Sequence, residues 1–322
     1  MERRVTALLP PATGEVRVRV EAAGVAYADI AVRQGLYRGV SVPVTPGYDF
    51  VGHVEALGPD VEGLHVGARV AGVTISGSYA SRRNVNANWI VPAPESASAV
   101  ELVAATLNGV TAWQMFHRVA RPEAGEWVLV HGAAGGVGTL LLDLAKLHGV
   151  RAIGSASPGK HEVIRERGAV AVDYREQDVC SIARQISGGG VSAVFDPIGG
   201  GHLRRVSIPS LREGGTAVLY GGYETTRGGR IRPTAVLDLL LNSSVSAFRL
   251  FSRSQTLATY AVPSWRDHRN SAYKEDLTHV LSLVAKGAIC PHVGATFPLA
   301  EAARAQQALE SRAVAGKVVL MM

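Results

Sequence analysis

The stretch EWVLVHGAAGGVGTLLLDLAKLHGVRAIGSASPGK, residues 126–160, decides the fold of this 322-residue chain. The apolar run at 127–130 predicts a short buried strand, and a cluster of glycines follows it at once. Leucines at helical spacing predict a helix over 139–148, which Gly149 ends. A second strand is expected over 150–155. The stretch is therefore interpreted as a strand–turn–helix–strand unit.

The glycine-rich turn has the composition that a bound dinucleotide requires. Glycines permit a tight turn and a close approach of the backbone to a pyrophosphate, and the N–H groups that open a helix attract its charge. A glycine pattern alone is weak evidence, but here a predicted strand precedes it and a predicted helix follows it. The residues expected to line the cofactor in this turn are Gly132, Ala134, Gly135, Gly136, Val137 and Gly138.

The composition fits a folded enzyme of two domains. Hydrophobic residues make up 47% of the chain and charged residues 19%, which argues against disorder. The net charge of +6 comes mostly from scattered arginines outside any basic tract with aromatic residues, so no nucleic acid is expected as a partner. Cys180 and Cys290 lack metal-ligand spacing, and no apolar stretch is long enough to span a bilayer. We expect a cytoplasmic protein with no membrane partner.

The rest of the chain predicts two kinds of domain. Residues 1–107 show short strand patterns broken by dense glycine and proline, which is typical of a compact β-barrel. Strand and turn signals at 191–200 and 214–222, with helical stretches between them, predict that the glycine-rich unit belongs to a doubly wound parallel sheet. Further elements are expected as helices over 96–120, 275–286 and 299–311 and as a strand in the last eight residues.

Several motifs, in one order along nearly the whole chain, carry a resemblance to a known family. They are RQGLY, VTPGYDFVGHVEALGPDV, VHGAAGGVG, ASPGKHEVIRERGA, DYREQD and FDPIGGG. The chain resembles the medium-chain dehydrogenase/reductase superfamily, in its zinc-free quinone oxidoreductase (zeta-crystallin-like) branch, and within it the vesicle amine transport protein subgroup.

The resemblance implies an α/β fold of two domains with the active site in the cleft between them. A GroES-like β-barrel catalytic domain is expected from residues 1–112 and 247–322, around a Rossmann doubly wound parallel sheet in residues 113–246. The resemblance also implies a homodimer, formed by edge pairing of the Rossmann sheets.

The residues after the second strand of the unit favour NADPH over NADH. An NAD-preferring unit has a carboxylate there for the ribose hydroxyls, whereas this sequence has Ser157 and then Lys160 with no acid between them. A hydroxyl and an ammonium suit a 2′-phosphate, which a carboxylate would repel. By resemblance, Tyr174 lies along the same phosphate. We therefore expect NADPH, with Ser157, Lys160 and Tyr174 at its 2′-phosphate.

The resemblance extends the expected cofactor site to five further residues. Asn108 and Thr111 lie where the family contacts the nicotinamide ribose and ring. Gly221 follows a strand end that passes the cofactor, Phe248 is placed near the carboxamide, and Lys317 near the phosphates. Each of three residues also has a structural role that would not require a cofactor. Thr111 could begin a helix, Phe248 could belong to the core, and Lys317 could be an exposed charge on a strand.

The positions that match the zinc ligands of zinc-dependent relatives are occupied by Ala26 and by Tyr48 with Asp49. An alanine and an ordinary tyrosine do not ligate zinc, and the four-cysteine lobe of those relatives is absent, so no metal is expected. Without a Lewis acid, hydride transfer to an already electrophilic carbon is favoured, as in a quinone or an α,β-unsaturated carbonyl.

Tyrosines are the candidate proton donors, foremost Tyr37 and Tyr48, with Tyr27 and Tyr79 in the same segments. Tyr37 aligns with a tyrosine that serves catalysis in enoyl-thioester reductases and that also occurs, without being required, in quinone reductases. A phenol with a pKa of about 10 can donate a proton, and water can do the same. The sequence leaves the source of the proton open.

Three functions remain open. The first is an NADPH-dependent reductase of small-molecule quinones or activated enones. The second is an enoyl-thioester reductase acting on a CoA- or carrier-bound chain of a fatty-acid or polyketide pathway, although the lysine of polyketide synthase enoyl reductases corresponds here to Gly222. The third is a non-catalytic NADPH-binding or structural role, as in lens crystallin relatives.

Overall fold

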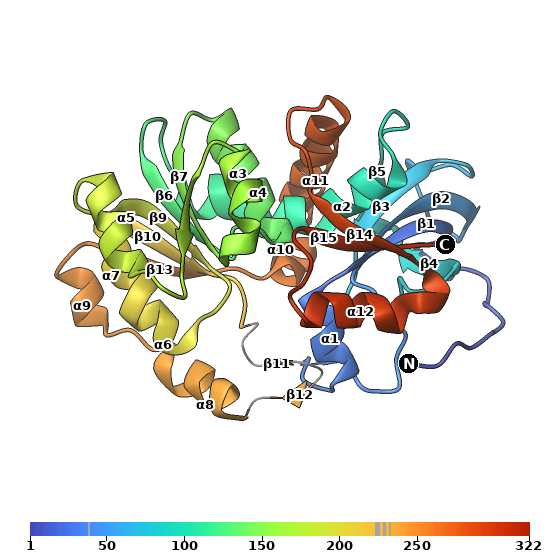
Figure 1. Cartoon of the computed structure of the whole chain (residues 1–322). Coiled ribbons are helices and arrows are strands. Elements are labelled where there is room, and N and C mark those ends of the chain that lie inside the picture. Colours follow the sequence, from blue (N-terminus) through green and yellow to red (C-terminus); the bar gives the residue numbers. More distant parts are fainter. Residues whose placement is uncertain (38, 223–225, 228–229, 232) are drawn as a thin grey trace. The chain divides into compact units, whose positions relative to one another are not determined.

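The computed structural model describes residues 1–37, 39–222, 226–227, 230–231 and 233–322 (Figure 1). The chain forms two compact units, each with hydrophobic core clusters of its own. Unit 1 comprises Met1–Val110 and Val262–Met322, and unit 2 comprises Thr111–Ala261. The first boundary lies close to the expected residue 112, within helix α2 (Ala99–Trp113).

The second boundary follows Ala261, later than the expected residue 246. Strand β13 (Thr256–Thr259) explains the difference, because it pairs in parallel with β10 (Leu211–Leu219) and extends the sheet of unit 2. Its residue Leu257 packs against the core of that unit. Four residues at the edge of a sheet are too few for a recognisable apolar pattern, so the sequence did not reveal this strand.

Unit 1 is built on a seven-stranded sheet to which both ends of the chain contribute (Figure 1). The strand order is β14–β15–β1–β2–β3–β5, and β4 also pairs with β1. The strands are β1 (Glu15–Val25), β2 (Asp49–Leu57), β3 (Arg69–Val73), β4 (Arg82–Asn86), β5 (Ile90–Pro92), β14 (Val293–Pro298) and β15 (Lys317–Met321). The last strand pairs antiparallel with the first, with Ala23 opposite Leu320. Strands from both ends of the chain thus share one sheet in this unit.

The alternation predicted for the first strand is present. Val16, Val18 and Val20 are buried in the core of unit 1, and Arg17 and Arg19 alternate with them. The helices of unit 1 are α1 (Tyr27–Arg33), most of α2, α10 (Val262–His268), α11 (Asn270–Ala285) and α12 (Ala302–Glu310), with short 3₁₀ turns at Ala87–Trp89 and Leu299–Glu301.

Unit 2 contains the predicted doubly wound parallel sheet, in the order β13–β10–β9–β6–β7–β8. The remaining strands are β6 (Trp127–His131), β7 (Arg151–Ala156), β8 (Val170–Asp173) and β9 (Val191–Asp196). The chain order reverses between β6 and β9, and ligands of such sheets bind beyond the carboxyl ends of the strands at this point. Both strands are almost entirely buried, as expected for a sheet covered on two faces.

Helices cover both faces of this sheet (Figure 1). Helices α3 (Gly136–Leu147) and α4 (His161–Arg165) lie on one face, and α5 (Val179–Ser187) and α7 (Ile208–Ser210) on the other. The other elements of unit 2 are the π-helical turns Gln114–Ala120 and Leu203–Ser207, the 3₁₀ turn Pro158–Lys160, α6 (Gly200–His202), α8 (Pro233–Asn242), α9 (Ala247–Phe251) and the strand pair β11 (Thr226–Arg227) and β12 (Arg230–Ile231). No helix among the described residues is both long and apolar enough to cross a membrane.

Candidate active site

The glycine-rich turn connects β6 to α3 and is closely packed. Gly132 has a φ of +63°, in the left-handed region that favours glycine. A Cβ atom at Gly138 would lie 2.5 Å from the carbonyl oxygen of Gly132 and 2.7 Å from the Cα of Ala133. A Cβ atom at Gly154, on β7, would lie 2.7 Å from the Cβ of Ala133. The three glycines therefore allow the turn to fold back against its own helix and the neighbouring strand.

Helix α3 begins at Gly136, three residues before the expected 139–148, because the glycines themselves adopt helical geometry after the N-cap Gly135. No side chain caps this end of the helix. The first N–H groups of a helix have no partners within it, so an oxyanion placed there accepts hydrogen bonds and is favoured by the helix dipole. Gly132, Gly135, Gly136 and Val137 are half-buried, whereas Ala134 is buried.

The three residues expected at a 2′-phosphate follow two adjacent strands. Ala156 at the end of β7 is paired with Asp173 at the end of β8, so Ser157 and Tyr174 leave neighbouring positions of the sheet edge. Lys160 ends the short turn that begins after Ser157. Ser157 and Lys160 are half-buried, and the Tyr174 side chain is 48% exposed. The structure thus brings their backbone positions to one edge of unit 2.

Arg175 was not predicted from the sequence as a site residue, and it adds a further positive charge at this edge. Its guanidinium carbon lies 5.8 Å from the centroid of the Tyr174 ring. Asp173, the last residue of β8, is buried and accepts a hydrogen bond from the backbone N–H of Arg175 at 3.0 Å. The motif DYREQD could have revealed this positive charge, since an arginine directly follows the tyrosine.

A buried polar cluster lies under the glycine-rich turn, at the ends of β6, β7 and β9. His131 Nδ1 and Ser155 Oγ are 2.9 Å apart, and the ring of His131 lies edge-on to that of His202 at 4.4 Å. Asp196 accepts hydrogen bonds from Ser207 Oγ at 2.6 Å and from the Gly199 N–H at 3.0 Å. The sequence showed neither histidine as part of a cluster, because these residues meet only when the strands are aligned.

Burial of His131, followed by the proximity of His202, lowers the pKa of His131 to about 3. The unfolded chain therefore binds this proton below a pH of about 6.5, whereas the folded chain does not until far lower pH, so the folded state loses stability as the pH falls. We expect His131→Gln to reduce the difference in unfolding free energy between pH 7 and pH 5 by about 2 kcal/mol. Urea unfolding at pH 7 and at pH 5 measures this difference in unfolding free energy.

Solvent-exposed His65 provides the matched control for this prediction. His65→Gln should retain the pH dependence of the unchanged protein. An equal pH dependence in His131→Gln and in the unchanged protein would show that His131 titrates similarly in the folded and unfolded chain.

In unit 1, two candidate proton donors meet. The hydroxyls of Tyr37 and Tyr48 are 2.8 Å apart, and either can donate. Tyr48 is buried and Tyr37 is half-buried. Burial, with a smaller contribution from Tyr37, raises the pKa of Tyr48 well above its ordinary value, so this phenol stays neutral at physiological pH. The pair therefore holds two protons on neighbouring oxygens, with Tyr37 as the more accessible member.

Beneath this pair, Lys317 forms a buried ion pair with Asp49. Its Nζ lies 3.0 and 3.2 Å from the two carboxylate oxygens, and the Lys317 side chain is only 3% exposed. Asp49 also accepts a hydrogen bond from the backbone N–H of Leu107 at 3.3 Å. Lys317 is therefore not the exposed strand charge that was one expectation. Its ammonium is engaged by Asp49, which makes it a poor phosphate ligand, and we do not retain it in the cofactor site.

The positions that match zinc ligands do not suit a metal. Ala26 offers no donor atom, the Tyr48 phenol is neutral, and the Asp49 carboxylate is neutralised by Lys317. Within the described residues, no group of three histidine, cysteine, aspartate or glutamate side chains is arranged to hold a metal ion. The donor set therefore does not fit a catalytic zinc.

The remaining expected cofactor residues are spread over several elements. Asn108 and Thr111 lie three residues apart on α2 and are both buried. Gly221 is exposed, and a Cβ atom there would lie 2.8 Å from the carbonyl oxygen of Pro197. Phe248 on α9 is 77% exposed and is not a core residue. The roles of these residues toward a cofactor remain predictions.

Two protein-family models match the chain. An alcohol dehydrogenase GroES-like domain matches residues 12–95, and a zinc-binding dehydrogenase matches residues 167–320. The synaptic vesicle membrane protein VAT-1 homolog of Rattus norvegicus is 32% identical over 97% of this chain and 78% of its own length. A 2-haloacrylate reductase of Burkholderia sp is 31% identical over 97% of this chain and 92% of its own length.

A polyketide synthase and a solved structure are also similar. A mycocerosic acid synthase-like polyketide synthase of Mycobacterium tuberculosis is 29% identical over 97% of this chain, which spans 14% of that protein. The crystal structure of an Escherichia coli quinone oxidoreductase complexed with NADPH superposes with a TM-score of 0.87 at 27% identity, covering 99% of this chain and 95% of that one.

Proposed function

Because this chain belongs to the medium-chain dehydrogenase/reductase superfamily, close to VAT-1 homologues and quinone oxidoreductases, we propose that it is a zinc-independent, NADPH-dependent reductase of quinones or activated enones. The observation that carries the proposal is the uncapped N-terminus of α3, reached through a turn in which Gly132 has a positive φ and Gly138 leaves no room for a side chain. Similarity to a 2-haloacrylate reductase and to a quinone oxidoreductase that holds NADPH supports the choice of acceptors.

When bound, NADPH supplies a hydride for an electrophilic carbon. The residues of the chain bind and orient it. The N–H groups of Gly136, Val137 and Gly138 would hold the pyrophosphate at the start of α3. Ser157, Lys160 and Tyr174 would hold the 2′-phosphate, with Arg175 adding positive charge beside Tyr174. Asn108, Thr111, Gly221 and Phe248 remain proposed contacts of the nicotinamide end.

The tyrosine pair would supply the proton that the reduced acceptor requires. Tyr37, the half-buried member, would donate from its hydroxyl to the developing enolate or hydroquinone oxygen. Tyr48 would then support the resulting phenolate through their 2.8 Å hydrogen bond. Because burial keeps Tyr48 neutral, it remains a donor throughout the physiological pH range.

The proposal is tested by steady-state oxidation of NADPH with a panel of simple quinones and enones. We expect turnover with members of both classes, and a kcat/KM for NADPH well above that for NADH. If no member of the panel oxidises NADPH although calorimetry detects its binding, the non-catalytic role would replace the proposed reductase. Absence of NADPH binding would reject the cofactor assignment itself.

An enoyl-thioester reductase is the second candidate, favoured by the similarity to a segment of a polyketide synthase. The two functions differ in acceptor. Crotonyl-CoA and crotonyl-pantetheine therefore belong in the same panel, together with a small enone of similar electrophilicity. A kcat/KM for the thioesters more than tenfold above that for the quinones and small enones would favour the second candidate.

Replacement of Tyr37 by phenylalanine tests the proton donor. We expect Tyr37→Phe to lower kcat for enone reduction by about 10²–10⁴, because general acid catalysis contributes this much, with an unchanged Kd for NADPH. Stopped-flow measurement of hydride transfer, with a solvent isotope effect, separates proton donation from binding. Tyr48→Phe is the matched control and should lose less. Full activity in both variants would assign the proton to water.

We further propose a homodimer formed through strand β13. This strand ends the sheet of unit 2, and among the described residues no other strand pairs with its outer edge. Light scattering coupled to size-exclusion chromatography tests the oligomeric state, with Leu257→Pro as the variant that removes a backbone donor from this edge.

A further inference from the structure

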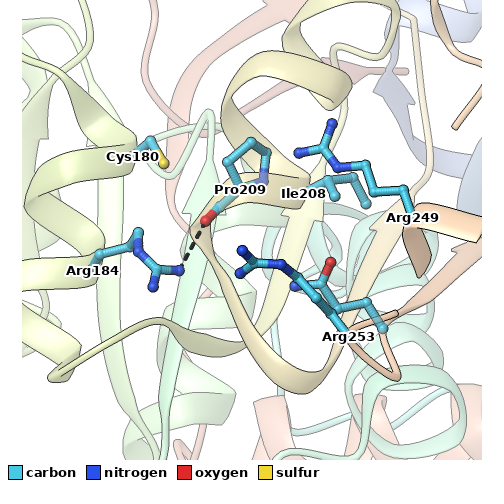
Figure 2. A pocket seen from close by; sticks show the side chains of 7 residues that line it. Cys180, Arg184, Ile208, Pro209, Arg249 and Arg253 are labelled. Atoms are coloured by element: carbon cyan, nitrogen blue, oxygen red, sulfur yellow. Dashed lines mark hydrogen bonds between the residues drawn. The ribbon is translucent and has the colours of Figure 1, made fainter. Parts of the chain in front are cut away.

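A cavity in unit 2 takes no part in the proposed reduction. The cavity has a volume of about 330 Å³, at the lower end of the range of small-molecule sites. It is lined by Cys180, Arg184, Ile208, Pro209, Arg249, Arg253 and Gln255 (Figure 2). These residues come from α5, α7, α9 and the segment that leads into β13. The site thus lies among the helices that pack beside the strands β9 and β10.

The cavity lies away from the cofactor edge of the sheet. Pro209 lies two residues before β10 and Gln255 directly precedes β13, so this part of the lining is at the amino ends of the strands. The glycine-rich turn and Ser157 follow strands and lie at the carboxyl ends. A ligand of the cavity is therefore distinct from the dinucleotide proposed above.

Three arginines give the cavity a strong positive charge, and no acidic side chain lines it. The Nη1 of Arg184 donates to the carbonyl oxygens of Pro209 at 3.1 Å and Leu211 at 3.2 Å, which fixes this guanidinium at the wall. Arg249 and Arg253 make no ion pair with any carboxylate in the part of the chain that the structure describes. In Figure 2, the guanidinium groups of Arg184 and Arg253 extend toward one another from opposite sides. Arg249 and Arg253 are exposed and Arg184 is half-buried, so their charges lie at the open side of the cavity, where they would attract an anion from solution.

The backbone of the segment that carries Arg253 is anchored beside the cavity. The carbonyl oxygen of Arg253 accepts a hydrogen bond from the Gly214 N–H at 3.1 Å. Gln255 donates from Nε2 to the carbonyl oxygens of Leu211 and Arg212 at 3.3 and 3.2 Å. The Oε1 of Gln255 is buried and has no hydrogen-bond donor among the described residues. A buried acceptor without a partner is unfavourable, and a hydroxyl of a ligand would supply the missing hydrogen bond.

We propose that this cavity binds a small organic phosphate. A phosphate monoester carries a charge of about −1.5 to −2 at pH 7 and three acceptor oxygens, which match several guanidinium groups better than a single carboxylate does. A hydroxyl on the ligand would donate to Gln255, and its carbon skeleton would lie against Ile208 and Pro209. Cys180, half-buried at the same cavity, provides a thiol whose reactivity reports occupancy.

The test measures modification of Cys180 in a Cys290→Ala background, where Cys180 is the only cysteine left in the sequence. The reagent is 4,4′-dithiodipyridine, a neutral disulfide that does not compete by charge. We expect glycerol 3-phosphate, at constant ionic strength, to slow modification at least fivefold. In an Arg249→Ala/Arg253→Ala variant this protection should disappear, and calorimetry should show at least a tenfold weaker Kd for glycerol 3-phosphate.

Three controls make the outcome specific. The charge-matched variant Arg3→Ala/Arg165→Ala, which removes two exposed arginines elsewhere, should keep the protection. Lys160→Glu should also keep it, since that residue belongs to the proposed nucleotide site. Equal protection by succinate would overturn the assignment to phosphate. Absence of both protection and calorimetric binding, or their persistence in Arg249→Ala/Arg253→Ala, would overturn the site.

Discussion

Replacement of Lys317 by methionine is expected to lower the free energy of unfolding by about 3–5 kcal/mol, because it leaves the carboxylate of Asp49 buried without its partner. Both side chains are almost completely buried, and the ammonium contacts both carboxylate oxygens. Gly24 leaves the space that the pair occupies, since a Cβ atom there would collide with both side chains. The Leu107 N–H supplies Asp49 with one hydrogen bond at 3.3 Å, which does not replace the lost positive charge.

Urea unfolding followed by circular dichroism and by tryptophan fluorescence measures this loss. Arg304→Ala is the matched control, because it removes one partner of an ion pair that is exposed to solvent, where such pairs contribute about 0–1 kcal/mol. A double variant, Lys317→Met with Asp49→Leu, should recover most of the stability, since an apolar pair often replaces a buried ion pair without loss. A loss below 1 kcal/mol in Lys317→Met would show that water reaches Asp49.

The second large effect concerns the choice of cofactor. Lys160→Glu is expected to lower kcat/KM for NADPH about 100-fold and to leave that for NADH within about threefold. A hydrogen bond to a charged group contributes about 1.5–3 kcal/mol, each 1.4 kcal/mol changes affinity tenfold, and the new carboxylate also repels the 2′-phosphate. Because Lys160 ends the turn that follows β7, we expect the change to act on the 2′-phosphate rather than on the pyrophosphate.

Steady-state kinetics with both cofactors, combined with calorimetric Kd values, measure the effect. Lys146→Glu is the matched control, because Lys146 is an exposed lysine in the last turn of α3 and carries the same charge change. An equal decrease for NADPH and NADH would indicate a general loss of the site. An unchanged preference for NADPH would assign the 2′-phosphate to Arg175 and Tyr174 instead.

Local patterns in the sequence predicted most of the fold. The alternation of valine and arginine in 16–20 and the buried run 127–130 both became strands, because a strand's side-chain periodicity can be read from consecutive residues. The glycines also marked the position of the turn. Glycine is favoured at residue 132, where φ is positive, and at residue 138, where a side chain would collide with the backbone. The patterns placed the start of α3 too late, since glycine has no side chain to contribute to periodicity.

Partners far apart in the sequence were not predicted. Lys317 was assigned to phosphates, and the structure shows it paired with Asp49, more than 250 residues away. His131 and His202 come together because β6 and β9 are neighbours in the sheet, and Arg249 and Arg253 face a cavity formed by helices from three parts of unit 2. Such groupings depend on strand order and helix packing, which no local pattern encodes.

The sequence by itself determined the class of fold, the place of the nucleotide-binding turn and the basic character of the residues after β7. These are properties of contiguous residues, set by glycine conformation, apolar periodicity and charge. Only the tertiary structure decided which charges are buried in pairs, which hydroxyls form a hydrogen bond and which arginines line one cavity. The physical reason is that burial and electrostatic energies depend on distance in space, and these distances exist only after the strands and helices have packed.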